Sequence, residues 1–158
     1  MQGTLNRRMS LENDIVVLGR VDLFSNLNND QLRLLAFGAE SVRLKAGRDL
    51  YREKAPADCG FVIVAGTVAL WQEQGGRRET LAIAGEGSLL GEMALITSGN
   101  RLTGATADSD CELLRLNRKL FRRMLEEYPE TAMALHARIS QNLHDMLSQI
   151  TRLDKAFE

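Results

Sequence analysis

Between residues 42 and 116, apolar residues fall in short runs that glycines and polar residues separate. Residues 42–45 alternate between aliphatic and basic side chains, which is the two-residue period of a half-buried strand. The other runs predict further strands at 50–51, 61–64, 68–71, 81–84, 89–90 and 113–116. The pair Gly75–Gly76 between two of these runs is a hairpin-turn signal. Short strands at this spacing predict an all-β sandwich, roll or barrel.

Helices are predicted on both sides of this β region. After a polar first dozen residues that we expect to be frayed, a helix is predicted from about Ser10, its candidate N-cap. Asn29 can cap a second short helix, and Asn117 a third. Pro129 interrupts the third helix, because the residue before a proline disfavours the αR conformation. A long helix is then predicted from about Glu130 to the C-terminus.

The composition narrows the class of protein. A chain of 158 residues with 44% hydrophobic and 26% charged residues fits one domain with its own core. The net charge of −1 offers no basic surface for nucleic acid, and no apolar run reaches the ~20 residues that cross a bilayer. Cys59 and Cys111 are too few for a disulfide framework or an iron–sulfur cluster. We therefore expect reduced thiols in a cytoplasmic protein, without membrane association.

The segment from Gly91 to Leu95, followed by Arg101, has the composition of an anion site. A guanidinium can hold a phosphate through two parallel charge-assisted hydrogen bonds. Gly91 permits close backbone approach, and the residues after it can begin a short turn whose N–H groups face an anion. Glu92 repels phosphate but suits a pair of sugar hydroxyls as acceptor. One carboxylate and one arginine, without a nucleophile and base, favour binding of a ribose phosphate over catalysis.

A simpler interpretation of these residues stays open. Glu92 and Arg101 are also compatible with an ordinary surface ion pair, and Gly91 with a tight turn alone. Elsewhere in the chain, His136 and His144 on the predicted long helix are too few ligands for a metal site. We expect no metal, no cofactor and no enzymatic activity.

The ordered set of motifs resembles the cyclic nucleotide-binding domain family. The sequence LFSNL at 23–27 is similar to the family's entry phrase, and Gly47 and Gly66 match glycines of its β-roll. The sequences GSLLGE at 87–92 and NRLTGAT at 100–106 match the approach to its phosphate-binding cassette and the end of that cassette. The resemblance covers roughly residues 23–153, and the whole ordered set is more specific than any one motif.

The resemblance implies a mainly β fold with flanking helices. Its centre would be an antiparallel β-roll of the double-stranded β-helix or jelly-roll type, with N-terminal helices and a long C-terminal helix. In a single domain, this assigns residues 1–22 to an N-terminal helical segment and 23–116 to the β-roll. The cassette would occupy about 87–106, and the C-terminal helices 117–158.

The resemblance also implies roles for individual residues. In the family, the position of Glu92 takes the ribose 2′-hydroxyl and that of Arg101 takes the cyclic phosphate. The other positions implied to bind the ligand are Gly91, Ala94, Leu102 and Thr103. The positions implied to approach the base are Leu81, Ala82, Met146 and Leu147.

Three departures from the family's pattern affect which nucleotide the site is expected to bind and how it binds. The position after the arginine is usually small or hydroxylated, and here it is Leu102. A threonine there favours cyclic GMP in the family, so cyclic AMP is predicted over cyclic GMP. Asn100 replaces a frequent proline, which should loosen the cassette. Met146 and Leu147 stand where the bacterial activator's long helix offers polar side chains, so base recognition is expected to be apolar, weaker or different.

Apolar residues in the long helix follow the seven-residue period of a coiled coil. They are Ala132, Leu135, Ile139, Leu143, Met146, Ile150 and Leu153. The first of them are expected to pack on the chain's own roll, and the later ones extend beyond what a small roll covers. A symmetric homodimer through this helix is therefore predicted, as the family resemblance also implies. The sequence stops at Glu158 without the helix-turn-helix of the bacterial transcription factors, so direct DNA binding is not expected.

Together these features predict a stand-alone cyclic nucleotide sensor whose ligand shifts the C-terminal helices. One alternative is a degenerate family member that no longer binds nucleotide and acts as a dimerisation or protein-interaction module with an unknown partner. Leu102, Met146 and Leu147 favour that alternative. Another is an effector domain for a different small anion or a redox signal.

Overall fold

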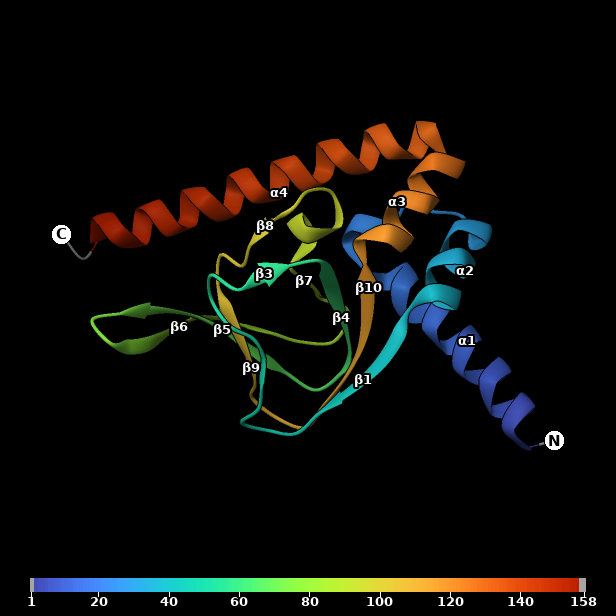
Figure 1. The fold of residues 1–158 in the computed structure, drawn as a ribbon, viewed down its shortest axis with the longest axis horizontal. Helices are drawn as coiled ribbons and strands as arrows, with labels where there is room; N and C mark the ends of the chain where they lie inside the picture. The colour runs from blue at the N-terminus through green and yellow to red at the C-terminus, as the bar shows by residue number, and fades with distance from the viewer. Residues whose placement is uncertain (1, 157–158) are drawn as a thin grey trace.

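The computed structural model describes the backbone of residues 2–156 and the side chains of residues 11–141, 144, 145 and 148. It confirms the mainly antiparallel β fold with helices at both ends of the chain. Figure 1 shows the N-terminal helices at the right of the strands and the long last helix running across the top. The N-terminal elements are α1 (Gln2–Arg20), the 3₁₀ helix η1 (Asp22–Phe24) and α2 (Asn29–Gly38).

Two details of the N-terminal prediction were wrong. Helix α1 begins at Gln2 and not near Ser10, because the first residues lack proline and include good helix formers such as leucine, arginine and methionine. Helix α2 is capped by Asn28 and not by Asn29. The Asn28 side chain accepts a 2.9 Å hydrogen bond from the backbone N–H of Gln31, whose own side chain accepts one from the Asn28 N–H, also at 2.9 Å. This reciprocal capping box satisfies two N–H groups at the start of the helix.

The strands form two four-stranded antiparallel sheets and one short pair. The first sheet has the order β1 (Glu40–Leu44), β10 (Cys111–Asn117), β4 (Cys59–Ala65) and β7 (Leu89–Leu90). The second has the order β2 (Asp49–Tyr51), β9 (Gly104–Ala107), β5 (Val68–Gln74) and β6 (Arg77–Ala84). The short pair joins β3 (Pro56–Ala57) to β8 (Gly99–Asn100). Strands β3, β8 and β9 had not been predicted, since their residues show no alternation of large apolar side chains.

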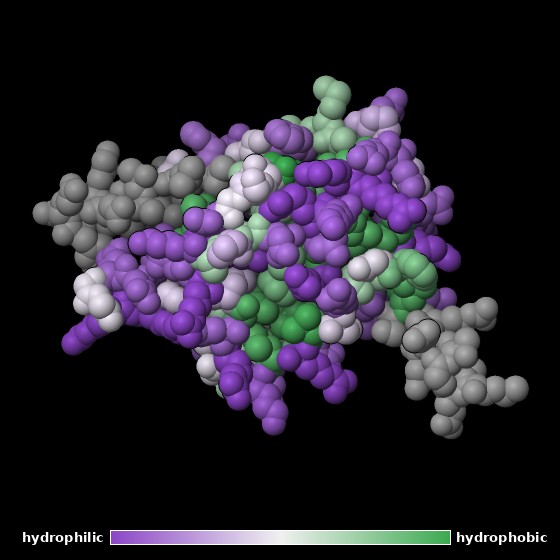
Figure 2. All heavy atoms as spheres, viewed as in Figure 1, coloured by the Kyte–Doolittle hydropathy of each residue, from purple (hydrophilic) through white to green (hydrophobic). Residues whose placement is uncertain are grey.

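The first sheet separates two apolar clusters. Along β4, Phe61 and Ile63 lie in a cluster shared with the second sheet, whereas Val62 lies in a cluster shared with the helices. This is the two-residue alternation of a strand buried on both faces. Outside these clusters the surface is mostly hydrophilic on the face that Figure 2 shows, interrupted by smaller apolar areas.

The predicted hairpin turn at Gly75–Gly76 and the predicted cap at Asn117 are confirmed. Gly75 (φ 61°) and Gly76 (φ 79°) connect β5 to β6, and a two-residue turn with two positive φ angles is the tight hairpin type. Asn117 caps α3 (Arg118–Glu127) by accepting a 2.8 Å hydrogen bond from the Leu120 N–H. Pro129 then begins α4 (Pro129–Ala156).

Helix α4 runs along one side of the roll (Figure 1). Leu135 and Ile139 are fully buried in the cluster that also holds Leu95 and Phe121, so the first part of the apolar stripe packs within the chain. The later stripe residues have side chains outside the described set; they are Leu143, Met146, Ile150 and Leu153. Among the described helices, none is both long and apolar enough to cross a membrane.

Asp49 links three strands of the second sheet. Its carboxylate accepts a 2.7 Å hydrogen bond from the Thr106 hydroxyl on β9 and a bidentate pair from Arg78 on β6 at 3.0 and 3.1 Å. The hydrogen bonds from Arg78 and then Thr106 lower the pKa of Asp49 below its ordinary value of 3.8. The ionised carboxylate therefore stabilises the fold above that value, and this contribution is lost as the pH falls through the lowered pKa.

We expect Asp49→Asn to lower the free energy of unfolding near neutral pH by about 0.5–1 kcal/mol, because the pair is partly exposed. Below the ordinary pKa of 3.8 the difference from wild type should shrink. Urea unfolding at pH 7 and pH 3 measures it, with Glu112→Gln as the control for a more exposed ion pair. An equal difference at both pH values would contradict the assignment.

Candidate functional site

The segment predicted to hold an anion folds as a sharp turn followed by a short helix. Gly91 lies in the left-handed region (φ 72°, ψ 35°) and is the N-cap of the 3₁₀ helix η2 (Glu92–Leu95). Only glycine adopts this conformation without steric cost. A Cβ atom on Gly91 would also collide with Nη1 of Arg101. The backbone at Gly91 therefore lies directly against the Arg101 guanidinium.

The backbone of Arg101 is fixed by the loop before β3. Its N–H donates to the carbonyl of Ala55 at 2.8 Å, and its own carbonyl accepts from the Lys54 N–H at 2.8 Å. The residue is only 7% exposed. An arginine buried to this extent is rare, since the charged group loses its water and must find other partners.

The surroundings of the Arg101 guanidinium are largely aromatic. Its central carbon lies 4.2 Å from the ring centroid of Tyr51 and 5.9 Å from that of Phe61. Burial raises the pKa of Tyr51 above its ordinary value of 10.0, although the Arg101 charge and a hydrogen bond with Thr103 lower it. The phenol therefore stays neutral at physiological pH, and it offers Arg101 a ring face and not a negative charge.

The hydrogen bonds of the Arg101 guanidinium are incomplete. Nη2 donates to the sulfur of Cys59 at 3.4 Å, and a thiol is a weak acceptor. Nε and Nη1 are buried and have no hydrogen-bond partner among the described residues. Buried donors left unpaired cost free energy, and charged ones cost most. The site is thus built to receive an acceptor, and an anion with more than one oxygen fits it best.

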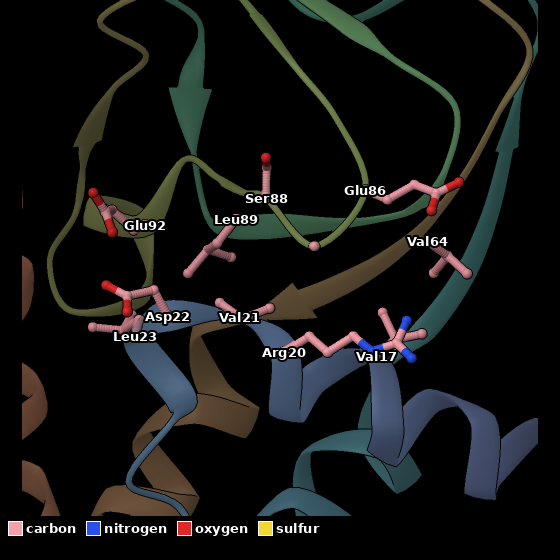
Figure 3. A pocket seen from close by; sticks show the side chains of 11 residues that line it. Val17, Arg20, Val21, Asp22, Leu23, Val64, Glu86, Ser88, Leu89 and Glu92 are labelled. Atoms are coloured by element: carbon pink, nitrogen blue, oxygen red, sulfur yellow. The ribbon is translucent and has the colours of Figure 1, made fainter.

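Glu92 lines a cleft on a different part of the structure from Arg101. A cleft with a volume of about 590 Å³ lies between α1, η1 and the turn from β6 to β7. Figure 3 shows Glu92 at one end of this cleft, close to Asp22 and Leu23, and Ser88 and Leu89 on its upper wall. Arg101 is not among the residues that line it. The ribose-binding role of Glu92 stays a prediction.

The other residues predicted to bind the ligand differ in how deeply they are buried. Ala94 is buried within η2, and Thr103 is half-buried beside Tyr51. The Leu102 side chain is 41% exposed, and its carbonyl accepts a 3.0 Å hydrogen bond from Gln72. On β6, Leu81 is half-buried and Ala82 is exposed. The side chains of Met146 and Leu147 lie outside the described set, so their contact with a base is a prediction only.

Sequence reasoning missed the side chains that surround Arg101. Cys59 and Phe61 come from β4 in the first sheet and Tyr51 from β2 in the second, and only the packing of the two sheets brings them to the same place. The available signal was the aromatic residue in each of two predicted strands. Among the described residues, no group of three or more histidine, cysteine, aspartate or glutamate side chains could hold a metal ion.

Known proteins resemble this chain over most of its length. A family model described as the cyclic nucleotide-binding domain matches residues 41–128. A solved structure of a cyclic nucleotide-binding-like protein from Brucella abortus is 52% identical with a TM-score of 0.66, and the match covers 72% of this chain and 98% of that one. The cyclic AMP receptor protein of Thermus thermophilus is 31% identical over 124 residues, which are 78% of this chain and 57% of that protein.

One relative is an enzyme by name. The mouse patatin-like phospholipase domain-containing protein 6 is 28% identical over 120 residues, which are 75% of this chain but 9% of that protein. The two proteins therefore share one segment of the larger chain. The chain therefore spans less than two thirds of this relative and of the Thermus receptor, namely 9% and 57% of their lengths.

We expect Gly91→Ala to lower the free energy of unfolding by at least about 1–2 kcal/mol, the cost of placing a residue with a Cβ in the left-handed region. The collision of that Cβ with Arg101 adds to the loss. Gly99→Ala is the matched control, because a Cβ there meets nothing within 4 Å and its φ is not positive. Denaturant unfolding of both variants measures the difference, and equal stability would contradict the close approach at Gly91.

Proposed function

The chain belongs to the cyclic nucleotide-binding domain family, and on that premise we propose that it is a sensor module that binds cyclic AMP in preference to cyclic GMP. The observation that carries this proposal is the buried Arg101 guanidinium with its Nε and Nη1 unpaired. A cyclic phosphate supplies two exocyclic oxygens, and charge-assisted hydrogen bonds to them satisfy these donors. Because buried donors without a partner cost free energy, pairing them with the phosphate adds to the affinity for the ligand.

Gly91 contributes to phosphate binding through its shape. Because it has no side chain, an anion at the Arg101 guanidinium also meets backbone N–H groups at the start of η2. Ala94 keeps this turn packed against the core. Thr103 is half-buried and forms a hydrogen bond with Tyr51, whose ring lies beside the Arg101 guanidinium.

We assign the sugar and the base to the remaining residues. Glu92, the first residue of η2, accepts hydrogen bonds from the ribose when its carboxylate turns towards the Arg101 side of the turn. The base is approached by Leu81 and Ala82 from β6 and by Met146 and Leu147 from α4. Leu102 supplies no hydroxyl to the pocket, which supports the preference for cyclic AMP. The proposal assigns binding and no catalytic step.

Ligand binding is coupled to the helices through η2. Leu95, at the end of η2, is 1% exposed and lies in the cluster with Phe121 and Met124 of α3 and with Leu135 and Ile139 of α4. A displacement of η2 by an anion therefore changes the packing of both helices. It shifts their equilibrium if the ligand prefers one arrangement over the other.

Two further features support the oligomeric state and the cellular compartment that we propose for the module. The late apolar positions of α4 support a homodimer through that helix, since Leu135 and Ile139 are already buried within the chain. Cys59 and Cys111 are free thiols, which supports a reducing compartment such as the cytoplasm.

We expect Arg101→Ala to abolish measurable binding of cyclic AMP, because its charge and its donors are lost together. Calorimetry on nucleotide-stripped protein measures binding of cyclic AMP and cyclic GMP, and the exposed Arg122→Ala on α3 is the control for a loss of positive charge. Unchanged affinity in Arg101→Ala removes the role assigned here. No heat with either nucleotide, from a folded wild-type sample, favours the interaction-module alternative.

We expect Ile150→Lys to convert a dimer into a monomer, since a lysine cannot be buried in an apolar helix–helix interface without a large cost. Gln141→Lys is the control, because Gln141 is exposed on the same helix and lies outside the apolar stripe. Light scattering coupled to gel filtration reports the mass of each variant. A monomeric wild type, or a dimeric Ile150→Lys variant, contradicts the proposed interface.

A further inference from the structure

Arg118, the first residue of α3, contacts three other segments of the chain. Its Nε donates to the carbonyl of Ala94 at 2.8 Å, and its Nη2 donates to the carbonyl of Ala57 at 2.5 Å. Its backbone N–H donates to the carbonyl of Asp58 at 2.9 Å. Hydrogen bonds from a charged donor at these distances are about twice as strong as neutral ones.

The two side-chain contacts reach the two segments that adjoin the anion site, η2 and strand β3. Ala94 belongs to η2, which follows directly on Gly91. Ala57 belongs to β3, and β3 pairs with β8, where Ala57 faces Gly99. Strand β8 ends at Asn100, immediately before Arg101. One guanidinium therefore joins the start of α3 to the segment that carries the turn and to the strand pair that positions the arginine.

The position of this charge in its helix indicates that these contacts are its role. The N-terminus of a helix favours acidic side chains and disfavours cations, because the first N–H groups carry partial positive charge. The first turn of α3 contains no acidic residue and begins with Arg118 and Lys119. Arg118 is half-buried, whereas Lys119 is exposed. The helix thus accepts an unfavourable charge at its start, and only Arg118 gains hydrogen bonds to other segments in return.

We infer that Arg118 is a positioning residue that couples the anion site to α3. Its planar guanidinium holds two carbonyls from different segments in a fixed relation to the helix. When η2 moves, Arg118 must either move with it, and carry the start of α3, or lose the bond to Ala94. The apolar contact of Leu95 with α3 lacks this directionality, since packed side chains can slide past one another. The inference rests on the proposed nucleotide-binding role of the same site.

The test compares Arg118→Gln with Lys119→Gln by amide hydrogen exchange. Both substitutions remove one positive charge from the start of α3, but only the first removes the bonds to Ala94 and Ala57. In the ligand-free protein we expect the amides of η2 to exchange about tenfold faster or more in Arg118→Gln, as follows from the loss of a charged hydrogen bond. Lys119→Gln should leave them unchanged.

The second arm measures transmission at saturating cyclic AMP. In wild type and in Lys119→Gln, binding should change the exchange rates of the α3 amides. In Arg118→Gln, nucleotide should still bind, because Arg118 does not contact the Arg101 guanidinium, but the change in α3 should fall to less than about half, as expected when one of two links between η2 and α3 is lost. Arg118→Lys, with one cationic head in place of a planar fork, should restore part of the response.

The outcomes separate this inference from the proposed function. If wild type binds no nucleotide, the proposed function fails, and the ligand-free arm still decides whether Arg118 holds η2 to α3. Unchanged η2 exchange in Arg118→Gln overturns the inference in that arm. In the arm at saturating cyclic AMP, the inference is overturned if the α3 amides of Arg118→Gln respond as strongly as those of wild type. If Arg118→Gln does not fold, Arg118→Lys is compared with wild type in both arms, and an unchanged α3 response again overturns it.

Discussion

The structure is organised around one buried positive charge whose hydrogen bonds are unfinished. Arg101 is held by backbone bonds to the loop before β3 and lies against the ring of Tyr51. Only the Cys59 sulfur accepts a hydrogen bond from its side chain among the described residues, and two nitrogens have no partner. Buried donors without a partner require an explanation, and we propose that a bound anion supplies the missing acceptors. The left-handed Gly91, the packing of η2 and the pairing of β3 with β8 all serve to bring backbone and guanidinium together at this point.

The same construction explains how a small site can act on distant helices. The turn that carries Gly91 continues into η2, and η2 is tied to α3 and α4 in two different ways. Leu95 provides an apolar contact in the shared core, and Arg118 provides directional hydrogen bonds from the start of α3. We propose that a change in the position of η2 is transmitted both by this apolar packing and by these directional hydrogen bonds. Glu92 of η2 also lines the cleft between α1, η1 and the β6–β7 turn, so the N-terminal elements border the same segment.

Local patterns predicted most of the fold and the centre of the site. Alternating residues at 42–45 and the Gly75–Gly76 pair predicted strands and a hairpin, since period and turn chemistry depend only on neighbouring residues. Pro129 separated the last two helices for the same reason. The residue types from Gly91 to Arg101 predicted one anion site, and the structure brings these two residues together. Where two adjacent residues could perform the same task, as Asn28 and Asn29 at the cap of α2, the choice between them was wrong.

Features that depend on pairing between distant segments could not be predicted in this way. Strands β3 and β8 are two residues each and exist because they face one another. The contacts of Tyr51 with Arg101 and of Arg118 with Ala94 can be recognised only once the arrangement of the strands and the position of the helix are known. These non-local contacts determine the surroundings of the two arginine side chains, whereas the sequence motifs predict only the turn and the short helix of the site.

The central claim is that a cyclic phosphate completes the hydrogen bonds of Arg101. The most direct measurement follows the Nε–H resonance of Arg101 by NMR, assigned by comparison with Arg101→Lys, while cyclic AMP or adenosine is added. The account predicts a new downfield position that saturates with cyclic AMP and is absent with adenosine, which lacks the phosphate. A resonance that stays in place while cyclic AMP binds, or that moves equally with adenosine, would contradict it.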